Sequence, residues 1–203
     1  MQLWTLTEVK PATLLAFQIG GALFIGAVLL KRFGQARTEA AVDAPSARRD
    51  WASLGGVALQ MIGISLASGP VRANGSSMLD GIESPRTWFT ALTIGGAVVL
   101  FFWAARTMGA NWSIVARMRQ GHELVTGGPF AMVRHPIYLA MLLFMLSLAA
   151  ATAHETALWA ALPVFVLGTL IRTTREEALL RVQFGAAYEA YAARVKRFIP
   201  GVL

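Results

Sequence analysis

The chain has 203 residues, of which 56% are hydrophobic and 14% are charged, and its mean hydropathy is +0.55. This composition argues against an ordinary soluble domain and favours an all-α integral membrane protein. Because the sequence contains no cysteine, disulfides, thiolate metal sites and a catalytic thiol are excluded. The formal charge of +7 does not indicate nucleic-acid binding, since the basic residues are scattered between apolar segments.

Five apolar segments are candidate transmembrane helices, approximately over residues 11–30, 51–69, 88–108, 137–152 and 157–171. The last two are short, and we expect them to form a helical hairpin whose turn contains His154 and Glu155. The sequence thus predicts about five transmembrane helices in a single membrane domain over residues 1–203. Within it we expect an N-terminal helical hairpin over 1–69 and a catalytic core over 88–203.

Small and polar residues in the first two apolar segments predict how these segments pack. Their glycines would let the two helices approach each other closely; these are Gly20, Gly21, Gly26, Gly55, Gly56 and Gly63. Gln18 and Gln60 are unusual inside such segments. For both, an interhelical hydrogen bond is favoured over a substrate contact.

The distribution of basic residues predicts the orientation in the membrane. Fifteen of the eighteen lysines and arginines follow the first, third or fifth apolar segment. The positive-inside rule then places the N-terminus outside the cell membrane, and the C-terminus and the loop before the fourth segment in the cytoplasm. This arrangement requires an odd number of transmembrane helices.

The loop before the fourth apolar segment, residues 121–138, reads GHELVTGGPFAMVRHPIY. Its Gly-Gly-Pro sequence predicts a turn whose backbone amides can approach a ligand, and Pro136 suits the first turn of the next helix. Arg134, His135 and Tyr138 would then cluster around a helix N-terminus at the membrane face. The partial positive charge of that end is suited to a carboxylate.

The segment after the fifth apolar stretch, residues 172–200, reads RTTREEALLRVQFGAAYEAYAARVKRFIP. Its apolar residues recur at helical spacing on one face, and they are Leu180, Phe184, Tyr188, Tyr191 and Val195. Gly185 predicts a break or bend in this helix. Glu176 and Glu177 fall near the membrane boundary, where carboxylates are unfavourable unless they are paired or hydrated.

Together the two segments resemble the isoprenylcysteine carboxyl methyltransferase family, which is similar in turn to membrane phospholipid N-methyltransferases. The loop block of this resemblance consists of Gly121, His122, Leu124, Val125, Thr126, Gly128, Pro129, Phe130, Arg134, His135, Pro136 and Tyr138. The tail block consists of Glu176, Glu177, Leu180, Phe184, Gly185, Tyr188, Tyr191, Val195, Ile199 and Pro200. The resemblance covers roughly residues 108–200. The first two apolar segments add only membrane topology to it.

The resemblance implies an S-adenosyl-L-methionine site outside the Rossmann architecture, and the sequence contains no G-x-G-x-x-G motif. By this analogy the loop supplies the cofactor pocket with Leu124, Val125, Gly128, Pro129, Phe130, Val133, His135, Tyr138 and Leu139. Glu177 and Tyr188 would close the pocket from the tail. No metal site is expected, because no cysteine or nearby histidine accompanies His135.

Arg134 and Glu176 are the candidate catalytic residues. The planar guanidinium of Arg134 suits a carboxylate on the acceptor or on the methionine part of the cofactor. Glu176 would accept a proton from an O–H or N–H nucleophile or position Arg172. The alternatives are that Arg134 anchors the protein at the headgroups, and that Glu176 and Glu177 only pair with Arg172 and Arg181 four residues away.

The expected partner is an amphiphilic lipid or prenylated small molecule that reaches the protein from the membrane lipids. An isoprenylcysteine carboxylate, a phospholipid amine and a phenolic or quinone-like hydroxyl all fit, and the sequence does not choose among them. Two other classes remain open: a membrane NADPH-dependent reductase of the sterol type, and a non-enzymatic membrane scaffold.

Overall fold

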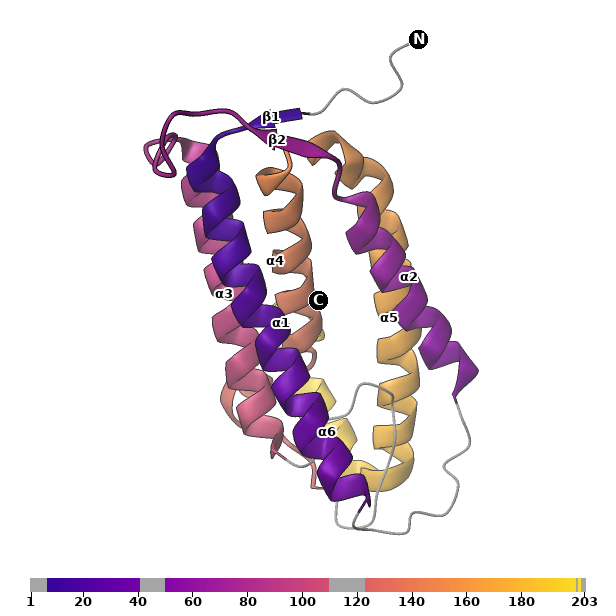
Figure 1. Cartoon of the computed structure of the whole chain (residues 1–203). Coiled ribbons are helices and arrows are strands. Elements are labelled where there is room, and N and C mark those ends of the chain that lie inside the picture. Colours follow the sequence, from indigo (N-terminus) through magenta and orange to yellow (C-terminus); the bar gives the residue numbers. More distant parts are fainter. Residues whose placement is uncertain (1–6, 41–49, 110–122, 200, 202–203) are drawn as a thin grey trace.

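A computed structural model describes residues 7–40, 50–109, 123–199 and 201 of the chain. The described residues are predominantly helical, in six α-helices: α1 (Pro11–Ala40), α2 (Trp51–Leu66), α3 (Pro85–Met108), α4 (Pro136–Ala151), α5 (Leu158–Phe184) and α6 (Ala186–Arg194). Two 3-10 helices, η2 (Gly128–Ala131) and η3 (Glu155–Ala157), precede α4 and α5. Strands β1 (Thr7–Val9) and β2 (Val71–Ala73) form a short parallel pair at one end of the helices (Figure 1).

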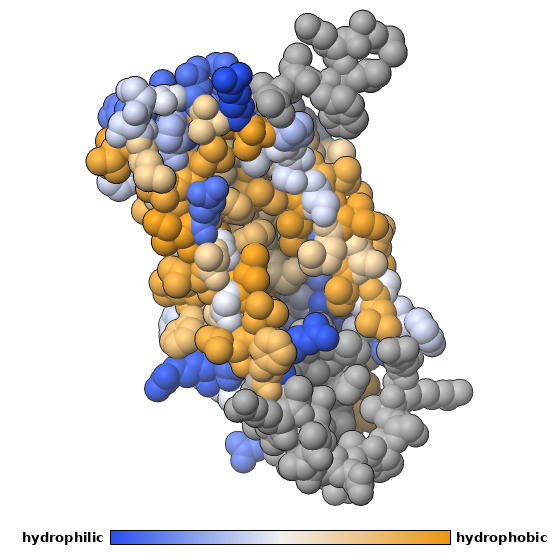
Figure 2. Space-filling view, viewed as in Figure 1, coloured by the Kyte–Doolittle hydropathy of each residue, from blue (hydrophilic) through white to orange (hydrophobic). Residues whose placement is uncertain are grey.

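Three helical segments are long and apolar enough to cross a membrane, namely Pro11–Phe33, Pro85–Met108 and Glu155–Phe184. Helices α2 and α4 are apolar but have 16 residues each. That length corresponds to about 24 Å, less than the roughly 30 Å of a bilayer core. Figure 2 shows apolar side chains over the middle of the molecule and hydrophilic ones at the end that carries β1 and β2. A mostly helical structure with three candidate membrane-spanning helices is therefore confirmed, and five spans stay a prediction.

The helices pack as two groups that meet at the end near β1 and β2. In the first group α3 packs against both α1 and α4, with the ring of Phe24 lying 5.0 Å from those of Phe101 and Phe144. In the second group α2 packs along α5 (Figure 1). Met145 of α4 and Phe165 of α5 belong to one buried cluster, which joins the groups. Helices α1 and α2 are not among the described pairs that pack extensively against each other.

The expectation that glycines bring the first two apolar segments together is wrong. A Cβ atom added at Gly20 would collide with Ile94 of α3. One added at Gly63 would lie 2.9 Å from the Cβ of Phe165 on α5. Small residues predict a close approach of two helices but not which helix is the partner. Here Gly20 of α1 lies against α3, and Gly56 and Gly63 of α2 lie against α5.

Helix α5 is longer than the apolar stretch that predicted it. The stretch ends near Ile171, but the helix continues to Phe184 over 27 residues. Arg172, Glu176 and Glu177 therefore lie on the same rigid element as the membrane-spanning part. The predicted break at Gly185 is confirmed, because this residue has φ of +48° and separates α5 from α6.

Candidate functional site

The loop before α4 and the chain after α6 lie against each other and pair through their backbones. Val133 and Lys196 form an isolated parallel bridge. The amide of Arg134 donates to the carbonyl of Lys196 at 2.8 Å, and that of His135 donates to the carbonyl of Arg197 at 3.1 Å. The structure thus brings together the two segments that carry the sequence motifs.

Helix α6 covers the short helix η2 through two buried tyrosines. The hydroxyl of Tyr191 donates to the carbonyl of Phe130 at 2.7 Å. The rings of Tyr188 and Tyr191 lie edge to face with centroids 6.1 Å apart. Burial raises the pKa of each tyrosine to about 12. Both side chains are therefore neutral hydroxyls at physiological pH.

Local backbone geometry explains the shape of the loop. Gly128 has φ of +57°, and a Cβ atom there would lie 2.6 Å from the Oγ1 of Thr107 on α3. A glycine is required for both reasons. Pro136 begins α4, as predicted, where its missing N–H leaves no hydrogen bond unmade. His135 occupies the N-cap position, but its side chain makes no capping hydrogen bond and is directed elsewhere.

Glu177 is the centre of a buried ion-pair cluster. Its side chain is 0% exposed and accepts two hydrogen bonds from Arg197, Nε at 2.9 Å and Nη2 at 2.8 Å. His135 Nε2 lies 3.1 Å from Oε1, and Arg134 and Arg181 each approach within 3.5 Å. The expected pair with Arg181 is present, but the loop and the tail also converge on this carboxylate. Such pairing is what a buried charge requires.

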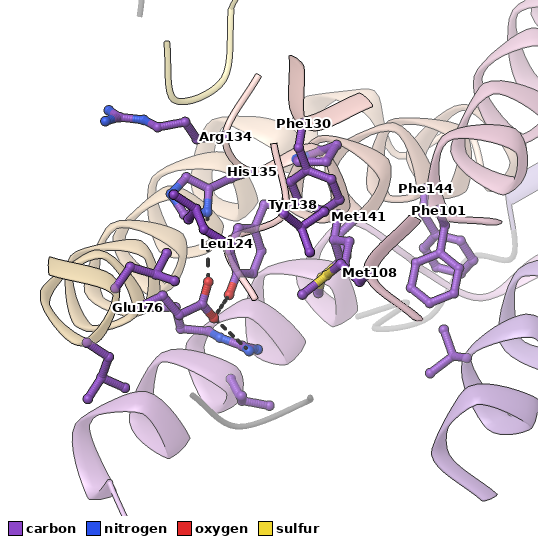
Figure 3. Close-up of a pocket in the computed structure, with 18 of the residues that line it drawn as sticks. Phe101, Met108, Leu124, Phe130, Arg134, His135, Tyr138, Met141, Phe144 and Glu176 are labelled. Carbon is purple, nitrogen blue, oxygen red and sulfur yellow. Dashed lines mark hydrogen bonds and ion pairs between the residues drawn. The ribbon is translucent and has the colours of Figure 1, made fainter. Parts of the chain in front are cut away.

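Glu176, the preceding residue, shares His135 with Glu177 but otherwise has different partners. Its Oε1 accepts hydrogen bonds from the Tyr138 hydroxyl and, at 3.5 Å, from Arg172 Nη2 (Figure 3). The Arg172 guanidinium also lies 5.2 Å from the centroid of the Tyr138 ring. Oε2 is 3.8 Å from His135 Nδ1. Glu176 is therefore held through one oxygen, while the other faces the side where His135 lies.

One cavity of about 470 Å³ joins these residues to the apolar interior. Its polar end is lined by Arg134, His135, Tyr138, Arg172, Glu176 and Tyr188, and its neighbouring walls by Leu124, Val125, Phe130, Leu180, Phe184 and Tyr191. From there an apolar arm extends between the two helix groups, lined by Phe24, Ile25, Val28, Leu29, Val57, Met61, Ile64, Phe101, Met141 and Phe144. Helices α1 and α2 thus form walls of the cavity. The two motif blocks gave no indication of this contribution.

The structure separates the predicted site residues into two sets. Those that line the cavity are Leu124, Val125, Phe130, Arg134, His135, Tyr138, Glu176 and Tyr188. Those that do not are Gly128, Pro129, Val133, Leu139 and Glu177. Gly121, His122 and Pro200 lie outside the described residues. Within those described, no group of three or more His, Cys, Asp or Glu side chains could hold a metal ion. A role in binding a cofactor stays a prediction for every member of both sets.

Two buried polar atoms at the polar end of the cavity make no hydrogen bond to the described residues. The Tyr188 hydroxyl and the Arg134 Nε are buried, and neither has a hydrogen-bond partner within the described part of the chain. Buried polar atoms are almost always hydrogen-bonded in folded proteins. Both residues line the cavity.

Sequence reasoning missed Gln60 and Arg197 as parts of this arrangement. Gln60 of α2 is fully buried and bonds to Thr169 and Arg172, so the interhelical hydrogen bond predicted for it is confirmed. Its closeness to the cavity could not be read from spacing, because 112 residues separate it from Arg172. Arg197 lies between motif positions of the tail, and only the pairing of Glu177 could have pointed to it.

The comparison with known families agrees with this geometry. The model of the family described as phospholipid methyltransferase matches residues 85–187, just over half of the chain. The chain belongs to the phospholipid methyltransferase family. The match includes η2, α4 and α5, which supply most of the polar end of the cavity. The resemblance predicted from the two motif blocks is therefore confirmed at the level of this family.

Two curated relatives of this chain are described as metal resistance proteins. Nickel-cobalt-cadmium resistance protein NccN of Alcaligenes xylosoxydans xylosoxydans is 33% identical over 119 residues, which is 56% of this chain and 53% of the relative. Cobalt-zinc-cadmium resistance protein CzcN of Cupriavidus metallidurans is 33% identical over 131 residues, which is 62% of this chain and 55% of the relative. The chain therefore matches little more than half the length of these relatives.

Proposed function

We propose that this protein transfers the methyl group of S-adenosyl-L-methionine to an amphiphilic acceptor embedded in the membrane. The observation that carries the proposal is the single cavity that joins the polar loop-and-tail end to an apolar arm between the helix groups. Its volume of about 470 Å³ falls within the roughly 300–1,000 Å³ of small-molecule sites. A polar donor and a lipid-like acceptor would meet where the two parts join.

The polar end fits the cofactor. When bound, S-adenosyl-L-methionine supplies an electrophilic methyl group on a sulfonium. Arg134 Nε and the Tyr188 hydroxyl are buried donors without a partner among the described residues, and they suit a carboxylate and ribose or amine groups. Phe130 and Tyr188 provide aromatic surface beside them. These residues would hold the cofactor and exclude water from it.

The place where the polar end of the cavity meets the apolar arm suits the reactive headgroup of the acceptor. Glu176 lines the cavity there and is anchored through Oε1 by Tyr138 and Arg172. Its carboxylate would take the proton that an O–H or N–H nucleophile releases, while the apolar arm holds the acceptor chain. A phospholipid amine or a phenolic lipid hydroxyl would use Glu176 in this way. A prenylated carboxylate carries no such proton and would depend on Arg134 or Arg172.

The proposed membrane placement has five transmembrane helices, the N-terminus outside and the site on the cytoplasmic side. It is supported by the direction of the helices, because α1 and α3 end, and α4 begins, at the end of the molecule that holds the polar part of the cavity (Figure 1). Lys31 lies near the end of the apolar part of α1, and Arg106 and Arg134 lie at the end of α3 and before the start of α4. Arg72 and Arg86 lie in β2 and the first turn of α3, at the opposite end.

Transfer of labelled methyl from S-adenosyl-L-methionine to a total membrane lipid extract tests the proposal. We expect a labelled lipid with purified protein, and its identification names the acceptor. Binding measured in parallel with S-adenosylhomocysteine and NADPH separates the other classes. Binding of NADPH alone would indicate a reductase, and binding of neither together with no labelled lipid would favour a scaffold.

A further inference from the structure

Gln60 of α2 links the second helix to the acceptor side of the cavity. Its side chain is 0% exposed in the middle of an apolar helix. Nε2 donates to Thr169 Oγ1 at 2.9 Å, and Oε1 accepts from Arg172 Nη1 at 3.2 Å. The amide is therefore oriented by both contacts, and its oxygen is directed at the guanidinium.

The backbones of α2 and α5 come close together where Arg172 passes between them. A Cβ atom at Gly56 would lie 2.5 Å from the Cγ of Arg172 and 2.9 Å from the carbonyl oxygen of Gly168. The aliphatic part of Arg172 thus lies against a glycine of α2. One turn further along, Gln60 holds the guanidinium, so α2 contacts this side chain along its length.

Arg172 connects Gln60 to residues that line the cavity. Its Nη2 donates to Glu176 Oε1 at 3.5 Å, and its guanidinium lies over the Tyr138 ring, whose hydroxyl bonds to the same oxygen. Arg172, Glu176 and Tyr138 all line the cavity, but Gln60 does not. Arg172 is therefore the cavity-lining residue to which Gln60 is hydrogen-bonded.

We infer that Gln60 is a positioning residue for the acceptor: it holds Arg172 so that Arg172 and Tyr138 fix the Glu176 carboxylate at the junction of the polar end and the apolar arm. The inference rests on the proposed function. Gln60 lies outside residues 85–187, which the family model matches. The orientation of the acceptor-facing charges is thus set in part by a helix that the family match does not include.

The test compares Gln60→Met with Thr169→Val, using detergent-solubilised membrane lipid extract as the acceptor at saturating S-adenosyl-L-methionine. Gln60→Met has a similar volume but no acceptor for Arg172. We expect about a tenfold lower kcat/KM for the acceptor, the loss given by one hydrogen bond to a charged group. The KM for S-adenosyl-L-methionine should change less than about twofold, because the bond lies on the acceptor side.

Thr169→Val is the matched control, since it removes the other bond of the same amide and leaves Gln60 and Arg172 in contact. It should lower kcat/KM less than about threefold. Gln18→Met controls for loss of a glutamine on an exposed face of α1. If Gln60→Met does not yield folded protein, Gln60→Asn replaces it, because the shortened amide no longer reaches Arg172.

A double-mutant cycle with Arg172→Lys shows whether Gln60 acts through the arginine. In that background Gln60→Met should have little further effect, since coupled residues are not additive. In a protein that transfers methyl groups, two results would overturn the role of Gln60. One is an equal loss of kcat/KM for Gln60→Met and Thr169→Val, and the other is additive effects of Gln60→Met and Arg172→Lys in the cycle. A wild-type protein that transfers no methyl group would overturn the proposed function and this role with it.

Discussion

Glu176 and Glu177 are neighbours in the sequence, but they lie in two regions of contrasting character. Around Glu177 the loop and the tail close on a fully buried carboxylate that Arg197, Arg134 and His135 surround. Around Glu176 the cluster is open to the cavity, and one carboxylate oxygen is held by Tyr138 and Arg172. Successive residues of a helix point about 100° apart. One helix therefore supplies a structural anchor to one region and the proposed general base to the other.

Glu177→Ala should have the largest effect, because it leaves the Arg197 and Arg134 guanidiniums without their shared carboxylate. Breaking a buried ion pair destabilises a protein by about 3–5 kcal/mol. We expect a lower thermal unfolding midpoint and proteolysis of the chain after α6 at lower protease concentration. Glu189→Gln is the control, since Glu189 pairs with Arg181 on the surface. Equal midpoints for both variants would contradict the anchoring role of Glu177.

Glu176→Gln should affect turnover rather than folding. Glutamine still accepts the Tyr138 hydrogen bond but cannot take a proton, and loss of a general base lowers kcat by about a hundredfold or more. The unfolding midpoint and the affinity for S-adenosylhomocysteine should stay close to wild type. Methyl transfer at the wild-type rate would show that the acceptor releases no proton to Glu176, as for a carboxylate acceptor.

Tyr188→Phe should weaken cofactor binding without a loss of stability, because its hydroxyl is buried and has no partner in the described part of the chain. A neutral hydrogen bond to the ligand contributes about 0.5–1.5 kcal/mol, or roughly two- to tenfold in Kd. Titration with S-adenosylhomocysteine measures the change. A variant that is more stable and binds as tightly as wild type would place Tyr188 outside the ligand contacts.

A smaller effect is expected from alkaline pH on the contact between α6 and the loop. Burial raises the pKa of Tyr191 from 10.0 to about 12. The neutral phenol therefore contributes stability that is fully present below pH 10 and is lost as the pH rises toward 12. Unfolding midpoints of wild type and Tyr191→Phe between pH 9 and pH 12 should converge as this contribution disappears. A constant difference across that range would contradict the assignment.

Short-range features were predictable from the sequence, and helix partners were not. Pro136 at the start of α4 and the break at Gly185 follow from backbone chemistry that depends only on the residue itself. The motif blocks identified the family and most residues of the polar end. In contrast, Gly20 of α1 packs on α3 and Gly63 of α2 packs on α5, because the choice of partner depends on the whole bundle.

The sequence likewise did not predict which individual residues of a helix line the cavity. Glu177 and Leu139 belong to the predicted site segments but do not line the cavity, whereas Met61 and Val28 do. Which side of a helix faces a cavity depends on how that helix is rotated in the bundle, and motif spacing does not contain this rotation. Glu177 was recognisable as unusual near a membrane boundary, but only the fold shows that cationic side chains surround it.

Gly185 has open space around it, since an added Cβ atom would meet no other atom within 4 Å. Even so, its φ of +48° disfavours any residue with a Cβ atom by about 1–2 kcal/mol. A replacement would touch nothing, yet it would shift the angle at which α6 leaves α5 and therefore the place where two tyrosine rings lie. The exposed residue Gly185 thus determines where Tyr188 and Tyr191 line the cavity, although Gly185 itself does not line it.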